Sequence, residues 1–310
     1  MAKKKLTVIY LVLNIVCSII IVLLNKWLYV HAGFPNITLS MIHFLITFIG
    51  LIICERMDVF CIKDVPLKEM LLIATTFCGF VVFTNLSLAN NTVGTYQIAK
   101  MLTTPCVIIM QIIFYKKYFS TLVKLTLIPI ILGVFINFYY DIQFNILGTV
   151  YATLGVLVTS LYQVLVNRKQ KEFQMDPIQL LYYQAPLSAI MLWSVIPIFE
   201  PVGSTFTLNW PFIDIIMVLL SGIIAFFVNL TSYWIIGYTS PLTYNMVGHS
   251  KFCLLLLGGS IVFNESLAIN QLIGITLTLV GIILYAHVKM QDNKSLLPQS
   301  VEDRNPLHKI

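Results

Sequence analysis

Long apolar runs dominate this chain, and short polar stretches separate them. The pattern predicts ten membrane-spanning segments, at about 6–30, 38–54, 68–89, 93–115, 122–139, 146–166, 177–199, 212–237, 240–263 and 268–288. A run of about 20 apolar residues crosses the hydrocarbon core of a bilayer as a helix that rises 1.5 Å per residue. No polar stretch between segments is long enough for a soluble domain. The sequence therefore predicts an all-α membrane protein with ten transmembrane helices.

The positions of lysine and arginine test this segment count independently. When the segments are threaded alternately through a membrane, sixteen of the 19 basic residues fall on one side. The connections on the other side carry none, and the three that remain, Lys26, Lys100 and Lys251, lie within segments. Because basic residues concentrate in cytosolic connections, both termini are predicted to be cytosolic. One missed segment would reverse every later connection and remove this asymmetry.

Composition supports a protein that lies in a lipid bilayer and excludes several function classes. The 310 residues are 58% hydrophobic and only 10% charged, whereas about 25% of a soluble domain is charged. The net charge of +6 is spread over the connections rather than gathered on one soluble face, so no nucleic-acid partner is expected. The six cysteines form no Cys-x-x-Cys pair, and neither a metal site nor a cofactor is expected.

The two halves of the chain resemble one another weakly. CSIIIVLLNK at 17–26 aligns with TSLYQVLVNR at 159–168, and Lys100 then falls opposite Lys251 in the fourth segment of each half. Because each half has an odd number of segments, the second copy must be inverted in the membrane. We therefore predict two inverted five-helix repeats, at 1–143 and 144–290, followed by a disordered cytosolic tail at 291–310.

Small residues and one proline predict local features of the helices. Pro105 leaves the carbonyl of Met101 without its helical donor, so we predict a kink in that segment. Glycines spaced seven apart are predicted to form close helix contacts, and these are Gly148 with Gly155 and Gly274 with Gly281.

Two lysines, Lys100 and Lys251, are chemically out of place, because each lies well inside an apolar run. A cation near the membrane midplane costs about 2.5–3.5 kcal/mol on insertion scales, so a carboxylate partner would be expected. All 13 aspartate and glutamate residues lie at segment ends, in connections or in the tail. The two lysines therefore predict an anionic ligand that comes from outside the protein.

Residues on the same helix faces as the lysines extend this candidate site. Gly248 has no side chain and leaves room for a ligand beside Lys251, whereas His249 lies on another face and is interpreted as a packing residue. Two other segments, at 68–89 and 212–237, add Thr84 with Asn85 and Asn229 within apolar surroundings. For these asparagines, hydrogen bonding between helices is the alternative to ligand contact. The candidate substrate-binding residues are Lys100, Lys251, Tyr96, Gln97, Tyr244, Gly248, Asn85, Asn229 and Thr84.

Tyrosines and glutamines in two later segments are open to two interpretations. Tyr182 and Tyr183 precede Gln184, and Tyr162 precedes Gln163. These side chains could stack on and hydrogen-bond a base or sugar. The alternative is that they are the ordinary tyrosine content of membrane helices.

The run LTYNMVGHSKF at 242–252 resembles the ninth-helix signature of the triose-phosphate and nucleotide-sugar translocators, which form solute carrier family 35 in the drug/metabolite transporter superfamily. TYQIAKMLTTP at 95–105 resembles their fourth-helix lysine region, and the similarity covers essentially the whole chain. The resemblance implies a ten-helix antiporter of the Golgi membrane whose phosphate ligands are Lys100 and Lys251. One departure is Phe252, where the phosphate-transporting members have arginine. Losing a bidentate phosphate ligand favours a substrate larger than a sugar phosphate.

These features favour a carbohydrate transporter, namely an antiporter that exchanges an anionic nucleotide-sugar for a nucleoside monophosphate by alternating access. The alternative is a transporter of small phosphorylated metabolites such as triose phosphate, phosphoenolpyruvate or pentose phosphate. An intramembrane enzyme is not favoured, because no Asp/His constellation marks a catalytic site. A structural or regulatory membrane protein that transports nothing is a further alternative, and the two membrane lysines argue against it. The base, the sugar and the choice between a monomer and a homodimer are left open by the sequence.

Overall fold

The computed structural model describes residues 2–139, 145–200, 210–263 and 268–295, and all regular structure within these ranges is helical. Nine helical stretches among them are long and apolar enough to span a membrane. The remaining predicted segment, 240–263, coincides with the 23-residue helix α12. In chain order the elements are α1 (Ala2–Trp27), the π-helical turn η1 (Leu28–Ala32), α2 (Asn36–Arg56), α3 (Leu67–Asn90), α4 (Val93–Met101), α5 (Thr103–Tyr115), α6 (Thr121–Leu125), α7 (Leu127–Phe138), α8 (Ile146–Glu172), α9 (Pro177–Phe199), α11 (Phe212–Tyr238), α12 (Pro241–Phe263) and α13 (Ile269–Ser295).

The last helix corrects one predicted boundary. Helix α13 continues to Ser295, so it includes the first residues of the tail predicted at 291–310. Residues after Met290 such as Gln291 and Lys294 are good helix formers, and Pro298 is the first residue that would break the helix. The rest of the predicted tail, 296–310, lies outside the described residues.

Two of the spans are interrupted, and a proline accounts for each interruption. Helix α4 ends at Met101, four residues before Pro105, and α5 begins after a one-residue turn. Because proline lacks an amide hydrogen, the carbonyl of Met101 loses its usual helical partner. Pro129 stands in the same relation to Leu125, where α6 ends and α7 begins. The predicted kink at Pro105 is therefore confirmed, and it lies one turn before the proline.

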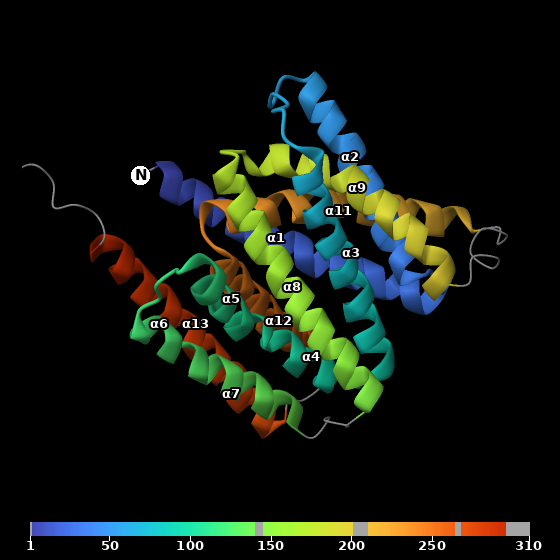
Figure 1. Ribbon diagram of the computed structural model, residues 1–310. Helices are drawn as coiled ribbons and strands as arrows, with labels where there is room; N and C mark the ends of the chain where they lie inside the picture. Colours follow the sequence, from blue (N-terminus) through green and yellow to red (C-terminus); the bar gives the residue numbers. More distant parts are fainter. Residues whose placement is uncertain (1, 140–144, 201–209, 264–267, 296–310) are drawn as a thin grey trace, which may run out of the picture.

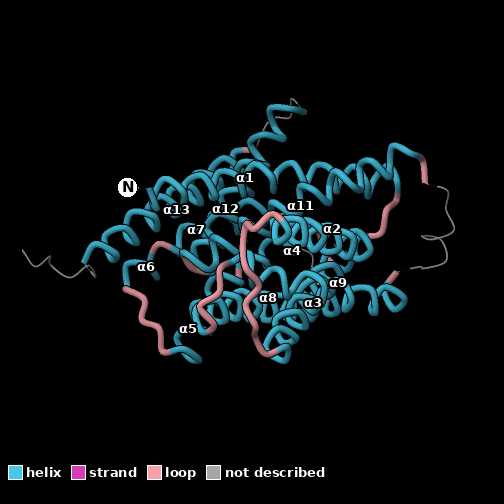
Figure 2. The backbone as a smooth tube through the Cα atoms, turned by 90° about the horizontal axis from the view of Figure 1, so that it is seen from above, coloured by secondary structure: helices cyan, strands magenta, loops and turns pink. Residues whose placement is uncertain are grey.

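Two large apolar cores hold the bundle together, and a smaller apolar cluster lies around η1. The larger core lies among α2, α3, α8, α9 and α11 and contains the fully buried Leu180 and Leu181. The second core lies among α4–α7, α12 and α13, with Ile130 at 1% exposure. Figure 1 shows α7 and α13 side by side at one side of the bundle and α2 and α9 at the other, and the view from above in Figure 2 agrees.

Helix pairs in this bundle approach closely at glycines. Helix α3 packs along α8, α1 along α11, α2 against α9 and α7 against α13. A Cβ atom on Gly133 of α7 would lie 2.5 Å from the carbonyl oxygen of Gly274 on α13, so only glycine fits there. A Cβ atom on Gly148 or Gly281 would also overlap the neighbouring helix, whereas one on Gly155 would make ordinary contacts. Three of the four predicted small-residue contacts are thus confirmed as close helix approaches.

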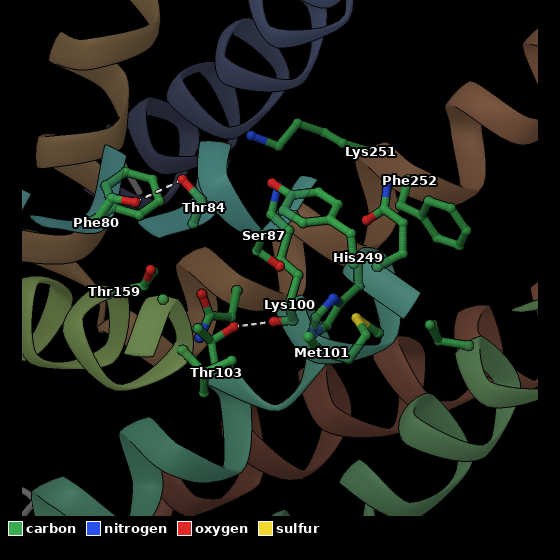
Figure 3. A pocket seen from close by; sticks show the side chains of 18 of the residues that line it. Phe80, Thr84, Ser87, Lys100, Met101, Thr103, Thr159, His249, Lys251 and Phe252 are labelled. Atoms are coloured by element: carbon green, nitrogen blue, oxygen red, sulfur yellow. Dashed lines mark hydrogen bonds between the residues drawn. The ribbon is translucent and has the colours of Figure 1, made fainter. Parts of the chain in front are cut away.

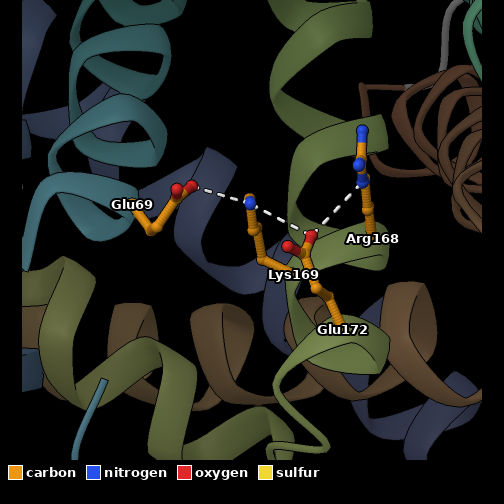
Figure 4. A network of polar contacts seen from close by, with 4 residues as sticks. All are labelled: Glu69, Arg168, Lys169 and Glu172. Carbon is orange, nitrogen blue, oxygen red and sulfur yellow. Dashed lines mark hydrogen bonds and ion pairs between the residues drawn. The ribbon is translucent and has the colours of Figure 1, made fainter. Parts of the chain in front are cut away.

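Three of the described ion pairs gather at one end of the bundle, where α3 begins and α8 ends. Lys169 Nζ lies 2.7 Å from a carboxylate oxygen of Glu69 and 3.0 Å from one of Glu172 (Figure 4). Arg168 Nε lies 3.3 Å from the same Glu172 carboxylate. Glu69 belongs to the first half of the chain and the other three residues to the second. The pairs therefore link the two halves at this end.

The connection between α5 and α6 belongs to the same end. Lys117 in this connection is half-buried. Burial, together with the nearby charges of Lys171 and Lys289, lowers its pKa to about 8. The end of α8, the end of α13 and the α5–α6 connection are therefore neighbours, which agrees with basic connections that share one side of the membrane.

Candidate substrate site: a cationic cavity in the bundle

A cavity of about 340 Å³ lies between the two cores. Its wall is built by α1, α3, α4, α5, α7, α8 and α12, so both halves of the chain contribute to it. Figure 3 shows Lys100, Lys251, His249 and Phe252 among the side chains around it. The volume lies within the usual range of small-molecule pockets.

Lys251 of α12 is held by polar groups of the first helix. Its Nζ donates to Asn14 Oδ1 at 2.9 Å and to Ser18 Oγ at 3.1 Å, and it lies 5.6 Å from the centre of the Tyr244 ring. Asn14 is fully buried, and its Nδ2 donates to Thr231 Oγ1 on α11 at 2.7 Å, which turns the Asn14 carbonyl toward the lysine. Within the described ranges, no carboxylate pairs with Lys251. Dipoles and a ring face stabilise the ammonium but do not neutralise it.

Lys100 of α4 brings a second cation to the same cavity. Its Nζ lies 5.8 Å from the centre of the Tyr96 ring. The Lys100 side chain is exposed although it lies inside the bundle, because it faces the open space of the cavity. Lys100 and Lys251 line the same cavity, and their like charges repel one another. In a medium of low dielectric such repulsion is strong, so this cavity favours an anion.

Seven of the nine predicted site residues lie on the cavity wall, and they are Lys100, Lys251, Tyr96, Gln97, Tyr244, Gly248 and Thr84. In the part of the chain that the structure describes, Asn85 and Asn229 are not on this wall. Asn229 of α11 instead donates to Thr47 Oγ1 of α2 at 3.1 Å, which is the interhelical alternative. The binding role predicted for Asn85 and Asn229 is therefore not carried into the proposal below.

Most of the ambiguous tyrosines and glutamines belong to packing networks. Tyr162 donates to the Tyr233 hydroxyl at 3.1 Å, and Tyr183 donates to the carbonyl of Lys63 at 2.8 Å. Gln163 is the exception, because it lines the cavity.

Other wall residues were missed or assigned differently from sequence. His249 lines the cavity, yet its Nε2 lies 2.9 Å from Thr104 Oγ1 on α5, which fits the packing interpretation. Asn245 lines the cavity, and Asn14 holds Lys251 from outside the wall, but neither is among the residues predicted from sequence. An amide inside an apolar run was the available signal for Asn14, and adjacency to Tyr244 was the signal for Asn245.

The fold and the site thus define a helical, multi-pass membrane protein with a central cationic cavity. Residues 5–286 match the Triose-phosphate Transporter family, and the chain belongs to this family of membrane transporters. The resemblance inferred from the lysine motifs is confirmed.

Comparisons with individual proteins agree with this assignment. UDP-xylose transporter 2 of Arabidopsis thaliana is 32% identical over 307 residues, which cover 95% of this chain and 87% of the relative. UDP-rhamnose/UDP-galactose transporter 2 of the same plant is 29% identical, with 88% of this chain and 80% of the relative covered. One solved crystal structure superposes on this chain with a TM-score of 0.71 and a sequence identity of 13%. The superposition covers 90% of this chain and 98% of the chain in that structure. That likeness shows the fold alone.

Proposed function

We propose that this protein is an antiporter that carries a UDP-sugar in exchange for a nucleoside monophosphate, with Lys100 and Lys251 as ligands of the phosphate groups. The observation that carries the proposal is the cavity itself, which holds two lysines and no described carboxylate partner. A diphosphate supplies the missing negative charge. The choice of a uridine nucleotide follows the similar plant transporters, which are named for UDP-xylose, UDP-rhamnose and UDP-galactose.

We also propose that residues 1–143 and 144–290 are inverted repeats. If α1, α2 and α3 correspond to α8, α9 and α11, the packed pair α3–α8 corresponds to the packed pair α11–α1. The pairs α2–α9 and α7–α13 each map onto themselves under the same correspondence. This pattern of pairs supports a two-fold relation between the halves. Rocking of one half against the other would then open the cavity to each side in turn.

The proposed orientation places both termini in the cytosol, in a Golgi membrane. The orientation is supported by the end of the bundle where α3 begins and α8 ends, because the basic residues of several connections gather there.

The alternative is a carrier of small phosphorylated metabolites. Phe252 lies on the cavity wall, and its ring packs 5.4 Å from that of Phe138. An apolar ring at this position offers no second phosphate ligand, which favours the larger nucleotide substrate.

The test is uptake by purified protein in liposomes loaded with UMP. We expect UDP-xylose or UDP-galactose to enter, and a GDP-sugar, a CMP-sugar and triose phosphate to enter much more slowly. Rapid uptake of triose phosphate without uptake of any nucleotide-sugar would overturn the proposal in favour of the alternative.

A graded series at Gly248 tests whether this cavity is the transport site. A Cβ atom on Gly248 would meet no atom within 4 Å, so alanine enters open space, and valine and leucine extend further into the cavity that Gly248 lines. We expect uptake to fall with side-chain size, by about tenfold or more for Gly248→Leu, because the added groups occupy substrate volume. Ala286→Leu, which adds a side chain of the same size on an exposed position of α13 that does not line the cavity, is the control and should transport normally. Full uptake by Gly248→Leu would contradict this location.

A further inference from the structure

Two buried side chains on the cavity wall carry polar atoms without a partner. Gln163 of α8 is 5% exposed and Asn245 of α12 is 7% exposed, and both line the cavity. Gln163 Oε1 and Asn245 Nδ2 make no hydrogen bond in the structure. Leaving a buried acceptor and a buried donor unsatisfied costs free energy. The other unpartnered side-chain atoms among the described residues, on Asn25, Asn91 and Asn137, are not on this wall.

The two side chains lie toward one end of the cavity. Tyr238, at the end of α11, donates to Asp176 at 2.8 Å, so the start of α12 lies beside the end of α8. Asn245 is in the first turns of α12, and Gln163 is in the half of α8 that leads to the same end. Lys251 follows Asn245 by six residues, or about 9 Å along the helix axis.

Lys100 reaches the same cavity from the second-last residue of α4. Helix α4 begins just after α3 ends, far from the Glu69–Lys169 pair at the start of α3. The same cavity wall thus presents two uncharged amides, from α8 and α12, as well as the two lysines.

We propose that Gln163 and Asn245 recognise the uracil of the bound nucleotide, a role that rests on the proposed UDP-sugar function. Uracil presents an N3–H donor beside the O4 acceptor. Gln163 Oε1 accepts from N3–H, and Asn245 Nδ2 donates to O4. Both unpartnered atoms are satisfied together, and the phosphates extend toward Lys251 and Lys100.

The test uses UMP and its N3-methyl analogue as competitors of UDP-sugar uptake by the full-length protein in liposomes. The methyl group removes the N3–H donor, so the analogue should inhibit the wild type about tenfold less well than UMP. Gln163→Leu should weaken inhibition by UMP about tenfold and should no longer distinguish the two competitors. Asn245→Leu should weaken inhibition by UMP but should still distinguish them.

Ribose 5-phosphate, which has no base, is the control for folding and for the two lysines. Its inhibition should be the same in the wild type and in both variants, because only the lysines bind it. Equal inhibition of the wild type by UMP, its N3-methyl analogue and CMP would overturn the base-recognition role while UDP-sugar uptake still supported the transport function. Inhibition by small phosphates without inhibition by UMP would overturn both.

Discussion

Replacing Lys251 or Lys100 by alanine is expected to abolish nucleotide-sugar exchange and to leave the protein folded. Each lysine contributes one of two cations in a cavity that has no described carboxylate partner for them. Losing a charged partner of a phosphate in such a site weakens binding by about a hundredfold or more. Folding should survive, because removing a membrane cation also removes an insertion cost of about 2.5–3.5 kcal/mol.

The measurement is uptake of a UDP-sugar into preloaded liposomes, with thermal unfolding in detergent to monitor the fold. Lys26→Ala is the matched control, because this lysine is exposed in the last turn of α1 and does not line the cavity. Lys251→Arg keeps the charge but changes its geometry relative to Asn14 and Ser18, so partial activity is expected. A fully active alanine variant at Lys100 or Lys251 would remove that residue from the site.

The lysines could be predicted from sequence because a charge inside a long apolar run is conspicuous. The spans could be predicted for a related reason, since apolar length and basic asymmetry are properties of the chain alone. Asn14 shows the limit of prediction from the sequence. Its partners Lys251 and Thr231 are separated from it by 237 and 217 residues. A single amide in the first span gives no sign of which distant helix it will meet.

Helix rotation is the other property that the sequence leaves open. Asn229 resembles a ligand residue as strongly as Thr84 does, yet it faces Thr47 on α2 while Thr84 faces the cavity. Adjacent Tyr162 and Gln163 diverge in the same way, one to Tyr233 and the other to the cavity wall. Neighbouring residues on a helix point about 100° apart. Tertiary packing, such as the close approach at Gly148, therefore decides which of them meets a ligand.

The second large effect concerns coupling, and we expect exchange to be obligatory. Proton- or sodium-driven carriers commonly bind the driving cation at an intramembrane carboxylate. None of this chain's 13 acidic residues lies deep within a predicted span. The cavity instead holds two lysines that repel one another. A substrate-free transition must enclose both charges away from water, which is costly, whereas a bound nucleotide on either side neutralises them.

Uptake of a UDP-sugar into liposomes loaded with UMP should therefore be at least about tenfold faster than uptake into empty liposomes. A pH gradient or a sodium gradient should change the rate little. The control is Lys26→Ala, which leaves both cavity lysines in place and should depend on internal UMP as strongly as the wild type does. Rapid net uptake into empty vesicles driven by a proton gradient would contradict this mechanism.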